Sequence, residues 1–229
     1  MPFRITSTGN AGVFLQNGKI GVYIDSFFLG VPSVGDGPAL RGKDADRADL
    51  ILITHSHYDH LHPEETRDAA LASGAVVAGP RDAVALLEKY LPPERLVVLE
   101  PAERQRPPAS VEREIAGIPV TTFRTYHGRG HNSYLLDIGG VRVFHDADNE
   151  RTQHYRVPSL GRVDVLLLCP WAGSGAGDFV AQLNPGRWFL IHMTGEEIDQ
   201  HRADSFLPAL ISPVPPGVVA LRGGETMEF

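Results

Sequence analysis

One short segment of the chain carries three histidines and an aspartate. The sequence from Thr54 to His60 reads THSHYDH. Imidazole nitrogens and carboxylate oxygens are the ligands that zinc and similar divalent metals take from proteins. In an extended segment His55 and His57 point to one side, while Asp59 and His60 lie beyond it and face a second point. This spacing suits two adjacent cations, and clustering of this kind favours a metal site over a polar loop with solvated histidines.

The elements around this segment predict how it is positioned. The apolar run Leu50 to Ile53 predicts a buried strand directly before the histidines. Earlier runs rich in β-branched and aromatic residues, with Asn17-Gly18 as a turn signal, predict an antiparallel meander over Phe3–Ser7, Gly12–Gln16 and Lys19–Asp25. After the histidines we expect a helix over Glu64–Ser73, with Pro63 at its start and Gly74 at its end, then a strand over Ala75–Ala78 and a helix over Arg81–Leu91.

The second half of the chain repeats this order. The Pro-rich stretch from Pro101 to Pro108 is interpreted as a surface connection within one domain that spans residues 1–229. Beyond it we expect strands over Ile118–Tyr126, Ser133–Ile138, Val141–His145, Val163–Leu168 and Trp188–Ile191, and helices over Asp178–Leu183 and Glu196–Leu210. A meander followed by helices therefore occurs twice. This repetition predicts an α/β (α+β) fold, a four-layered αββα sandwich rather than a doubly wound sheet.

Composition narrows the class of protein. The chain has 229 residues, 42% of them hydrophobic, which suffices for a full core. No apolar stretch approaches the roughly 20 residues of a membrane span, and the first ten residues lack the pattern of a signal peptide. Cys169 stands alone and forms no intrachain disulfide, so we expect a cytoplasmic protein without a membrane partner. The net charge of -7 argues against a protein that acts mainly on nucleic acid.

The order His-x-His-x-Asp-His after a buried strand resembles the signature of the metallo-β-lactamase superfamily. Members of this superfamily have the αββα fold and usually bind two metal ions. The resemblance covers essentially the whole chain and implies further ligands at later strand ends. It implies His127 as the third histidine, with His131 as the rival, and Asp148 as the bridging aspartate, with Asp146 as the rival. The last ligand is then His192, which follows the apolar strand Trp188–Ile191.

Carried over residue by residue, the resemblance implies one metal held by His55, His57 and His127. It implies a second metal held by Asp59, His60 and His192, with Asp148 bridging the two. The mixed nitrogen and oxygen ligands point to two divalent ions, zinc first, although manganese or iron would accept the same set. Asp25 matches an acidic position of the family that orients a ligand. Asn10 departs from the lactonase-like branch, which often has a histidine there.

The implied chemistry is hydrolysis. Two adjacent cations lower the pKa of a shared water from about 15.7 towards 7, which leaves a hydroxide between them as the nucleophile. We expect Asp59 to hold this hydroxide and His131 to donate a proton to the leaving group or to contact the substrate. Arg129, on the same loop, could bind an anion, and the Gly-rich loop from Trp171 to Gly177 either cradles an oxyanion or lets the chain turn past the metals.

The expected substrate is a small, anionic molecule with an ester, lactone or phosphodiester bond. Two other functions stay open at this point. One is a nucleic-acid phosphodiesterase, which would need a basic groove leading to the metals. The other is a non-catalytic or redox diiron protein on the same fold. The oligomeric state, including a homo-oligomer, is left open.

Overall fold

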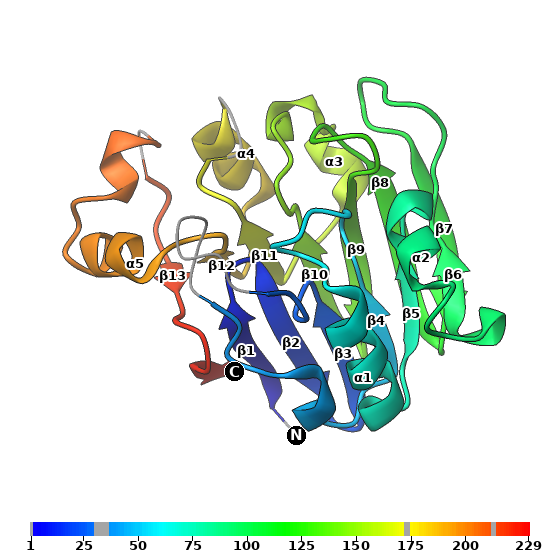
Figure 1. Ribbon diagram of the computed structural model, residues 1–229. Coiled ribbons are helices and arrows are strands. Elements are labelled where there is room, and N and C mark those ends of the chain that lie inside the picture. The colour runs from blue at the N-terminus through cyan, green and yellow to red at the C-terminus, as the bar shows by residue number, and fades with distance from the viewer. Residues whose placement is uncertain (1, 30–36, 172–174, 212–213) are drawn as a thin grey trace.

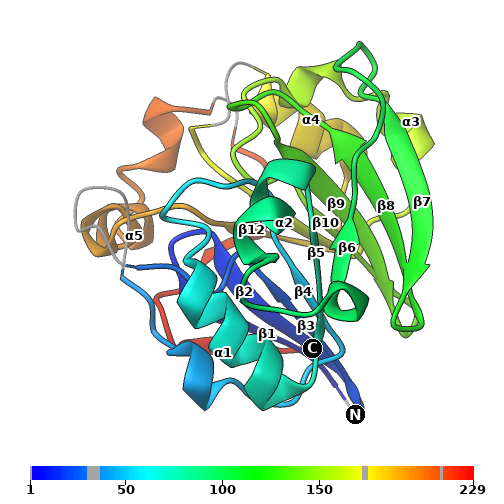
Figure 2. The ribbon, with the colours of Figure 1, turned by 45° about the vertical axis from the view of Figure 1, so that its right-hand side comes forward.

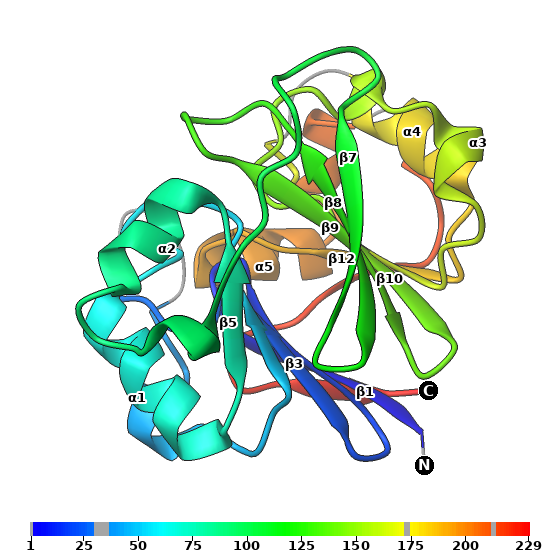
Figure 3. The same ribbon diagram turned by 90° about the vertical axis from the view of Figure 1, so that its right-hand side faces the viewer.

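Two β-sheets lie face to face and helices cover their outer faces, as the edge-on view of Figure 3 shows. The structure is a computed structural model that describes residues 2–29, 37–171, 175–211 and 214–229. Within these ranges each sheet has seven strands. The arrangement is the four-layered αββα sandwich that the repeated order of strands and helices predicts.

The first sheet combines the N-terminal meander with parallel strands. Its strand order is β14-β1-β2-β3-β4-β5-β6. The neighbours from β14 to β3 pair antiparallel, and those from β3 to β6 pair parallel. The strands are β1 (Phe3–Gly9), β2 (Gly12–Asn17), β3 (Ile20–Ile24), β4 (Leu50–Leu52), β5 (Val76–Gly79), β6 (Leu96–Val98) and β14 (Thr226–Glu228).

The second sheet has the same design in the order β13-β12-β11-β10-β9-β8-β7. The pairs from β13 to β10 are parallel and those from β10 to β7 are antiparallel. The strands are β7 (Ser110–Ile115), β8 (Ile118–Arg124), β9 (Asn132–Ile138), β10 (Val141–His145), β11 (Val165–Leu168), β12 (Arg187–Leu190) and β13 (Val218–Ala220).

Three apolar clusters separate the four layers. The central cluster lies between the sheets and joins residues such as Leu15 and Leu50 to Leu136 and Leu167. A second cluster packs the first sheet against its helices, and a third packs the second sheet against the helices on its outer side. Helices α1 and α2 cover the first sheet (Figures 1 and 2), and the helices are α1 (Pro63–Ser73), α2 (Arg81–Leu87), α3 (Val157–Leu160), α4 (Ala176–Leu183) and α5 (Gly195–Arg202).

The helix after the histidine segment follows its sequence signals. It begins at Pro63, His62 caps its N-terminus by accepting a hydrogen bond from Glu65 N, and Gly74 ends it with a left-handed φ of 83°. The expected closing helix over Glu196–Leu210 is too long. The α5 helix ends at Arg202, because Asp204 takes a φ of 57° and the chain then turns before Leu207. The α2 helix likewise ends at Leu87 instead of continuing to Leu91.

The parallel strands direct their carboxyl ends to one edge of the sandwich. The segments that follow β4, β10 and β12 meet there, at the upper edge in the view of Figure 1. The end of β8 lies at the same edge. Its last residue, Arg124, pairs with Asn132, the first residue of β9, and Asn132 N donates to Thr54 O at 2.9 Å. None of the helices in the described ranges is both long enough and apolar enough to cross a membrane.

Candidate metal centre

The buried strand β4 delivers the histidine segment to this edge. Ile53 is buried and its carbonyl accepts a hydrogen bond from Tyr134 Oη at 2.6 Å, so the strand end is tied to the second sheet. Ser56 Oγ donates to Asp82 Oδ2 at 3.0 Å, which holds the segment against the start of α2. The histidines therefore follow a strand end that is fixed in place, at an edge to which both sheets contribute residues.

The first group of potential ligands consists of His55, His57 and His127. Each offers a ring nitrogen, and these three atoms lie within 4.8 Å of one another. The Nε2 atom of His127 lies 3.3 Å from Nδ1 of His57. His55 is 2% exposed, whereas His57 is exposed, so the group runs from the interior to the surface. The structure thus brings together the three side chains that the resemblance implies for one metal.

The second group consists of Asp59, His60 and His192, whose ligand atoms also lie within 4.8 Å of one another. Asp59 Oδ2 lies 3.5 Å from His60 Nε2 and 3.2 Å from His192 Nε2. His192 takes a left-handed φ of 61°, and its N–H donates to Asn10 O at 2.9 Å. This backbone turn after β12 directs the imidazole towards the end of the other sheet.

Asp148 lies between the two groups. Its Oδ2 atom is 3.2 Å from Nε2 of His60 and 3.2 Å from Nε2 of His192. The same oxygen lies 3.8 Å from His127 Nε2 and 4.0 Å from His55 Nε2. One carboxylate therefore faces imidazoles of both groups. In the part of the chain that the structure describes, the seven side chains that the resemblance implies as ligands therefore form one cluster.

Unpaired buried atoms show that this donor set fits cations. Nε2 of His55, Nε2 of His60 and Oδ1 of Asp148 are buried and have no hydrogen-bond partner among the residues that the structure describes. An unpaired polar atom inside a protein costs about 1–3 kcal/mol, so a cluster of such atoms indicates a missing partner. Imidazole and carboxylate donors in this combination suit zinc, manganese or iron. The cluster thus has the composition and the unpaired donors of a metal centre.

Asp25 orients His60 within the cluster. Its Oδ2 atom lies 2.8 Å from His60 Nδ1, while its carboxylate also accepts hydrogen bonds from Thr54 N at 2.8 Å and Thr54 Oγ1 at 2.5 Å. Both oxygens are therefore in use, although Asp25 lies close enough to His55 and His60 to form a third group of potential ligands. Because Nδ1 faces Asp25, Nε2 of His60 is left for a metal.

Asn10 occupies the position where the lactonase-like branch often has histidine. It is 7% exposed, and its Nδ2 atom donates to Asp59 O at 3.0 Å and lies 3.3 Å from Asp59 Oδ2. The backbone carbonyl of Asn10 accepts the hydrogen bond from His192 N. Asn10 thus contacts two potential ligands of the second group, and its φ of 48° is a conformation that asparagine tolerates better than most residues.

His131 lies behind the cluster rather than over it. It is fully buried, its Nε2 atom accepts a hydrogen bond from Asp148 N at 3.2 Å, and its Nδ1 atom lies 2.7 Å from Thr125 Oγ1. Burial lowers the pKa of this imidazole well below its usual value. Both ring nitrogens have partners within the protein, and the expected role of His131 as a proton donor or substrate contact stays a prediction. The ring connects the backbone at Asp148 with the side chain of Thr125, so it holds Asp148 in place.

Asp146, the rival for the bridging position, faces away from the cluster. Its carboxylate accepts hydrogen bonds from the side chains of Ser133, Asn149, Thr152 and Tyr155. Burial raises the pKa of this fully buried carboxyl to about 7. Asp146 therefore ties the turn after β10 to the second sheet, and Ala147 then adopts a left-handed φ of 51° that directs the next side chain, Asp148, inwards.

Two side chains that touch this region have no counterpart among the residues singled out from the sequence. Glu150 Oε1 lies 3.0 Å from Nδ1 of His127, so the carboxylate faces the ring nitrogen opposite the one near His57. Arg104, in the stretch interpreted as a surface connection, donates to the backbone of the loop that carries His127. Glu150 has a spacing signal, since it comes two residues after Asp148. Arg104 has none, because its contact depends on how two loops fold together.

The ionisation of the cluster predicts how it responds to pH. Burial lowers the pKa of His192, but hydrogen bonds with Asp148 and Asp59 outweigh it and raise the pKa to about 9 from 6.5. Burial likewise opposes a proton on His60, yet Asp148 and Asp25 raise its pKa well above the usual value. In the metal-free protein these shifts favour the doubly protonated form of both rings, and a cation that binds Nε2 must displace that proton.

We expect metal uptake near neutral pH to release at least one proton, because the pKa of His192 lies above neutrality and that of His60 is also raised. Calorimetry in buffers of different ionisation enthalpy measures this number. The raised pKa also adds stability that is complete below about pH 6.5 and is lost as the pH rises through about 9, so the metal-free protein should unfold more easily at the higher pH. Uptake without proton release would show that neither ring carries a second proton in the metal-free protein.

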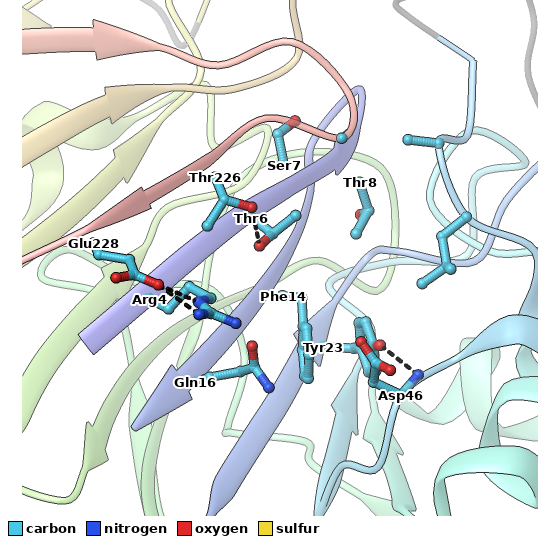
Figure 4. A pocket seen from close by; sticks show the side chains of 13 residues that line it. Arg4, Thr6, Ser7, Thr8, Phe14, Gln16, Tyr23, Asp46, Thr226 and Glu228 are labelled. Carbon is cyan, nitrogen blue, oxygen red and sulfur yellow. Dashed lines mark hydrogen bonds and ion pairs between the residues drawn. The ribbon is translucent and has the colours of Figure 1, made fainter. Parts of the chain in front are cut away.

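A separate hollow lies on the outer face of the first sheet (Figure 4). It has a volume of about 550 Å³ and is walled by side chains of β1, β2 and β14, with the Arg4–Glu228 ion pair on one side and Tyr23 on the other. None of the seven cluster residues lines it. Ala172, Gly173 and Ser174 of the Gly-rich loop fall outside the described residues, so that expectation stays as stated.

Comparisons with known proteins bear on the family and the fold. Residues 27–193 match the family described as Beta-lactamase superfamily domain. A Pyrococcus furiosus protein named as a metal-dependent hydrolase is 28% identical over 171 residues, which are 72% of this chain and 71% of the relative. The metallo-beta-lactamase fold protein YhfI from Bacillus subtilis superposes with a TM-score of 0.68 at 14% identity over 100% of both chains.

A further solved structure has the same fold. Igni18, a metallo hydrolase from Ignicoccus hospitalis, superposes with a TM-score of 0.67 at 15% identity, over 100% of this chain and 99% of that one. At such identities the likeness concerns the fold alone. The sequence match covers most of the chain, including every residue of the cluster from His55 to His192. The chain therefore belongs to the metallo-β-lactamase superfamily.

Proposed function

We propose that this protein is a metal-dependent hydrolase with a dinuclear centre. The observation that carries the proposal is the position of Asp148, whose single Oδ2 atom lies within 4.0 Å of imidazole nitrogens from both groups of ligands. His55, His57 and His127 would hold one divalent ion, and Asp59, His60 and His192 the other. Asp148 would bridge them, and the donor set favours zinc.

Two cations bound side by side supply a nucleophile by lowering the pKa of water towards neutrality. The residues of the chain prepare the site for that chemistry. Asp25 and Glu150 face the outer nitrogens of His60 and His127, so each ring turns its Nε2 atom inwards. Asn10 Nδ2 lies 3.3 Å from Asp59 Oδ2, so Asn10 orients the carboxylate that would hold the hydroxide.

The surroundings of the site support a small, anionic substrate with an ester, lactone or phosphodiester bond. Arg129 lies on the same loop as His127, is exposed, and forms no ion pair among the described side chains. An exposed guanidinium on a loop that carries a metal ligand could pair with a carboxylate or phosphate of the substrate. With a net charge of -7, the chain offers little general attraction for nucleic acid.

Elemental analysis of the purified protein, joined to a screen of phosphodiester, lactone and thioester substrates, tests the proposal. We expect two equivalents of zinc per chain and hydrolysis in at least one substrate class that stops when the metal is chelated. Iron with absorbance in the near ultraviolet and no hydrolysis would contradict it and favour a redox protein.

The substitution His57→Ala tests the first group of ligands separately. His57 is exposed, so its removal should leave the fold unchanged while metal bound by His55 and His127 is lost. We expect about one equivalent of metal to remain and hydrolysis to fall by at least about 10- to 100-fold, the loss typical of weaker, indirect partners of a metal. Unchanged metal content and activity would remove His57 from the site.

A further inference from the structure

The loop that carries His127 has few hydrogen bonds among its own backbone groups. It leaves β8 at Arg124, and its base closes where Thr125 N donates to His131 O at 3.1 Å. Residues 125–131 are all described, and no other backbone hydrogen bond joins two of them. The carbonyl groups at the tip of the loop, at His127, Gly128 and Arg129, therefore have no partner within the loop, and water or side chains from elsewhere in the chain must supply it.

Arg104 is the partner that these carbonyls share, and Arg124 Nη2 also donates to Arg129 O at 2.8 Å. Its Nε atom donates to Thr125 O at 2.8 Å. Its Nη2 atom donates to His127 O at 2.9 Å, lies 3.4 Å from Arg129 O, and also contacts Gly128 O. The guanidinium further lies 5.7 Å from the centre of the Tyr126 ring. One side chain from the connection between β6 and β7 therefore reaches every residue from Thr125 to Arg129.

The physical reason for an arginine here is the arrangement of the carbonyl groups. Successive carbonyls that point to one place repel one another unless a cation with several diverging N–H groups lies between them. The Nε and Nη2 atoms of Arg104 carry three N–H groups in one rigid plane and reach Thr125 O and the carbonyls of the loop tip, whereas the three N–H groups of an ammonium lie around one point. Gly128 adopts a left-handed φ of 47°, which lets the chain reverse so that its neighbours' carbonyls converge.

By binding the carbonyl groups of the loop, Arg104 fixes the backbone that carries the imidazole of His127. The carbonyl of His127 is held by Arg104, and its ring Nδ1 atom faces Glu150 Oε1 at 3.0 Å. Its Nε2 atom then faces His57 and Asp148. We propose that Arg104 is a positioning residue that preforms the His127 side of the first metal site. The inference rests on the proposed function, since it assigns a partner to one of the two cation sites.

The test compares Arg104→Ala with Arg142→Ala, a matched control. Arg142 also donates from its guanidinium to backbone carbonyls, of Leu160 and Arg162, but at a connection that contributes none of the seven cluster residues. The metal-free proteins are titrated with Co²⁺ and with Zn²⁺ alone, and the two affinities are resolved by cobalt absorbance and calorimetry. Unfolding temperatures are measured on the same samples.

We expect Arg104→Ala to weaken one of the two affinities by about 10- to 100-fold, the loss typical when a partner behind a metal ligand is removed, and to leave the other unchanged. Arg142→Ala should lower only the unfolding temperature. Methylguanidinium added to Arg104→Ala should restore part of the lost affinity, and Arg104→Lys, which provides the second variant if the alanine protein does not fold, should retain less affinity than the parent.

Equal metal affinities in Arg104→Ala and the parent protein would overturn the inference while leaving the dinuclear proposal intact. An equal loss of affinity in Arg142→Ala would also overturn it, since the effect would then be one of general stability. A parent protein that binds fewer than two ions would overturn the dinuclear proposal, and the assigned role of Arg104 with it.

Discussion

Replacing Asp148 with alanine is expected to release metal from both sites at once. The carboxylate is the only group whose oxygen lies within 4.0 Å of His55, His60, His127 and His192 among the described residues. Its pKa is held well below the usual range, because the charges of His60 and His192 outweigh the effect of burial. Hydrolysis should fall by more than about 100-fold, since even an indirect partner of a metal costs about 10- to 100-fold.

The control for this substitution is Asp146→Asn. Asp146 is fully buried, and its carboxylate accepts hydrogen bonds only from Ser133, Asn149, Thr152 and Tyr155 among the described side chains. This change should lower the stability of the protein and keep most of its metal. Metal content per chain separates the two. If Asp146→Asn loses more metal than Asp148→Ala, the bridge lies two residues earlier.

A measurement without metal gives an independent check. In the metal-free protein, hydrogen bonds with Asp148 and Asp59 raise the pKa of His192 to about 9 against the effect of burial. Asp148→Asn removes one of these charges and keeps the shape of the side chain. The pKa of His192 should therefore fall, as followed by nuclear magnetic resonance of the imidazole protons. A value that stays near 9 would show that Asp148 does not face this ring.

The residues that could be predicted from the sequence are those whose chemistry follows a strand end directly. His55 and His57 come straight after the apolar run that forms β4, and His192 follows the run that forms β12. The parallel strands of both sheets end at one edge. The order of strands and ligands in the sequence therefore already predicts that these ligands lie close together. The choice of Asp148 over Asp146 is not local in this way. It depends on the left-handed turn at Ala147.

Other parts of the molecule depend on pairing between distant segments. The strand β14 is only three residues long and pairs with β1 from the opposite end of the chain. The strand β7 has a charged, exposed sequence, SVEREI, and is a strand because it pairs along β8. Neither sequence shows the apolar alternation of a half-buried strand. Arg104 is missed for a similar reason, since its function lies in the carbonyl groups it reaches.

Replacing Asp25 with alanine is expected to have the second large effect, on stability as well as on metal. The Asp25 side chain is fully buried, and its carboxylate is the acceptor for Thr54 N and Thr54 Oγ1 and faces His60 Nδ1. Removing one partner of a buried, hydrogen-bonded charge pair costs about 3–5 kcal/mol. The loss should appear in the metal-free protein as a lower midpoint of denaturation by urea.

The same change should weaken the site that contains His60, because the ring would lose the contact that turns its Nε2 atom inwards. Asp25→Asn keeps the size of the side chain and tolerates the left-handed φ of 47°, so it separates lost orientation from lost folding. We expect Asp25→Asn to fold and to bind one metal about 10- to 100-fold more weakly. Asp164→Asn is the control, because Asp164 also accepts from a backbone N–H and from an arginine, far from any potential ligand. If the two asparagine variants bind metal equally well, the carboxylate of Asp25 does not set the orientation of His60, and the ring is held by packing alone.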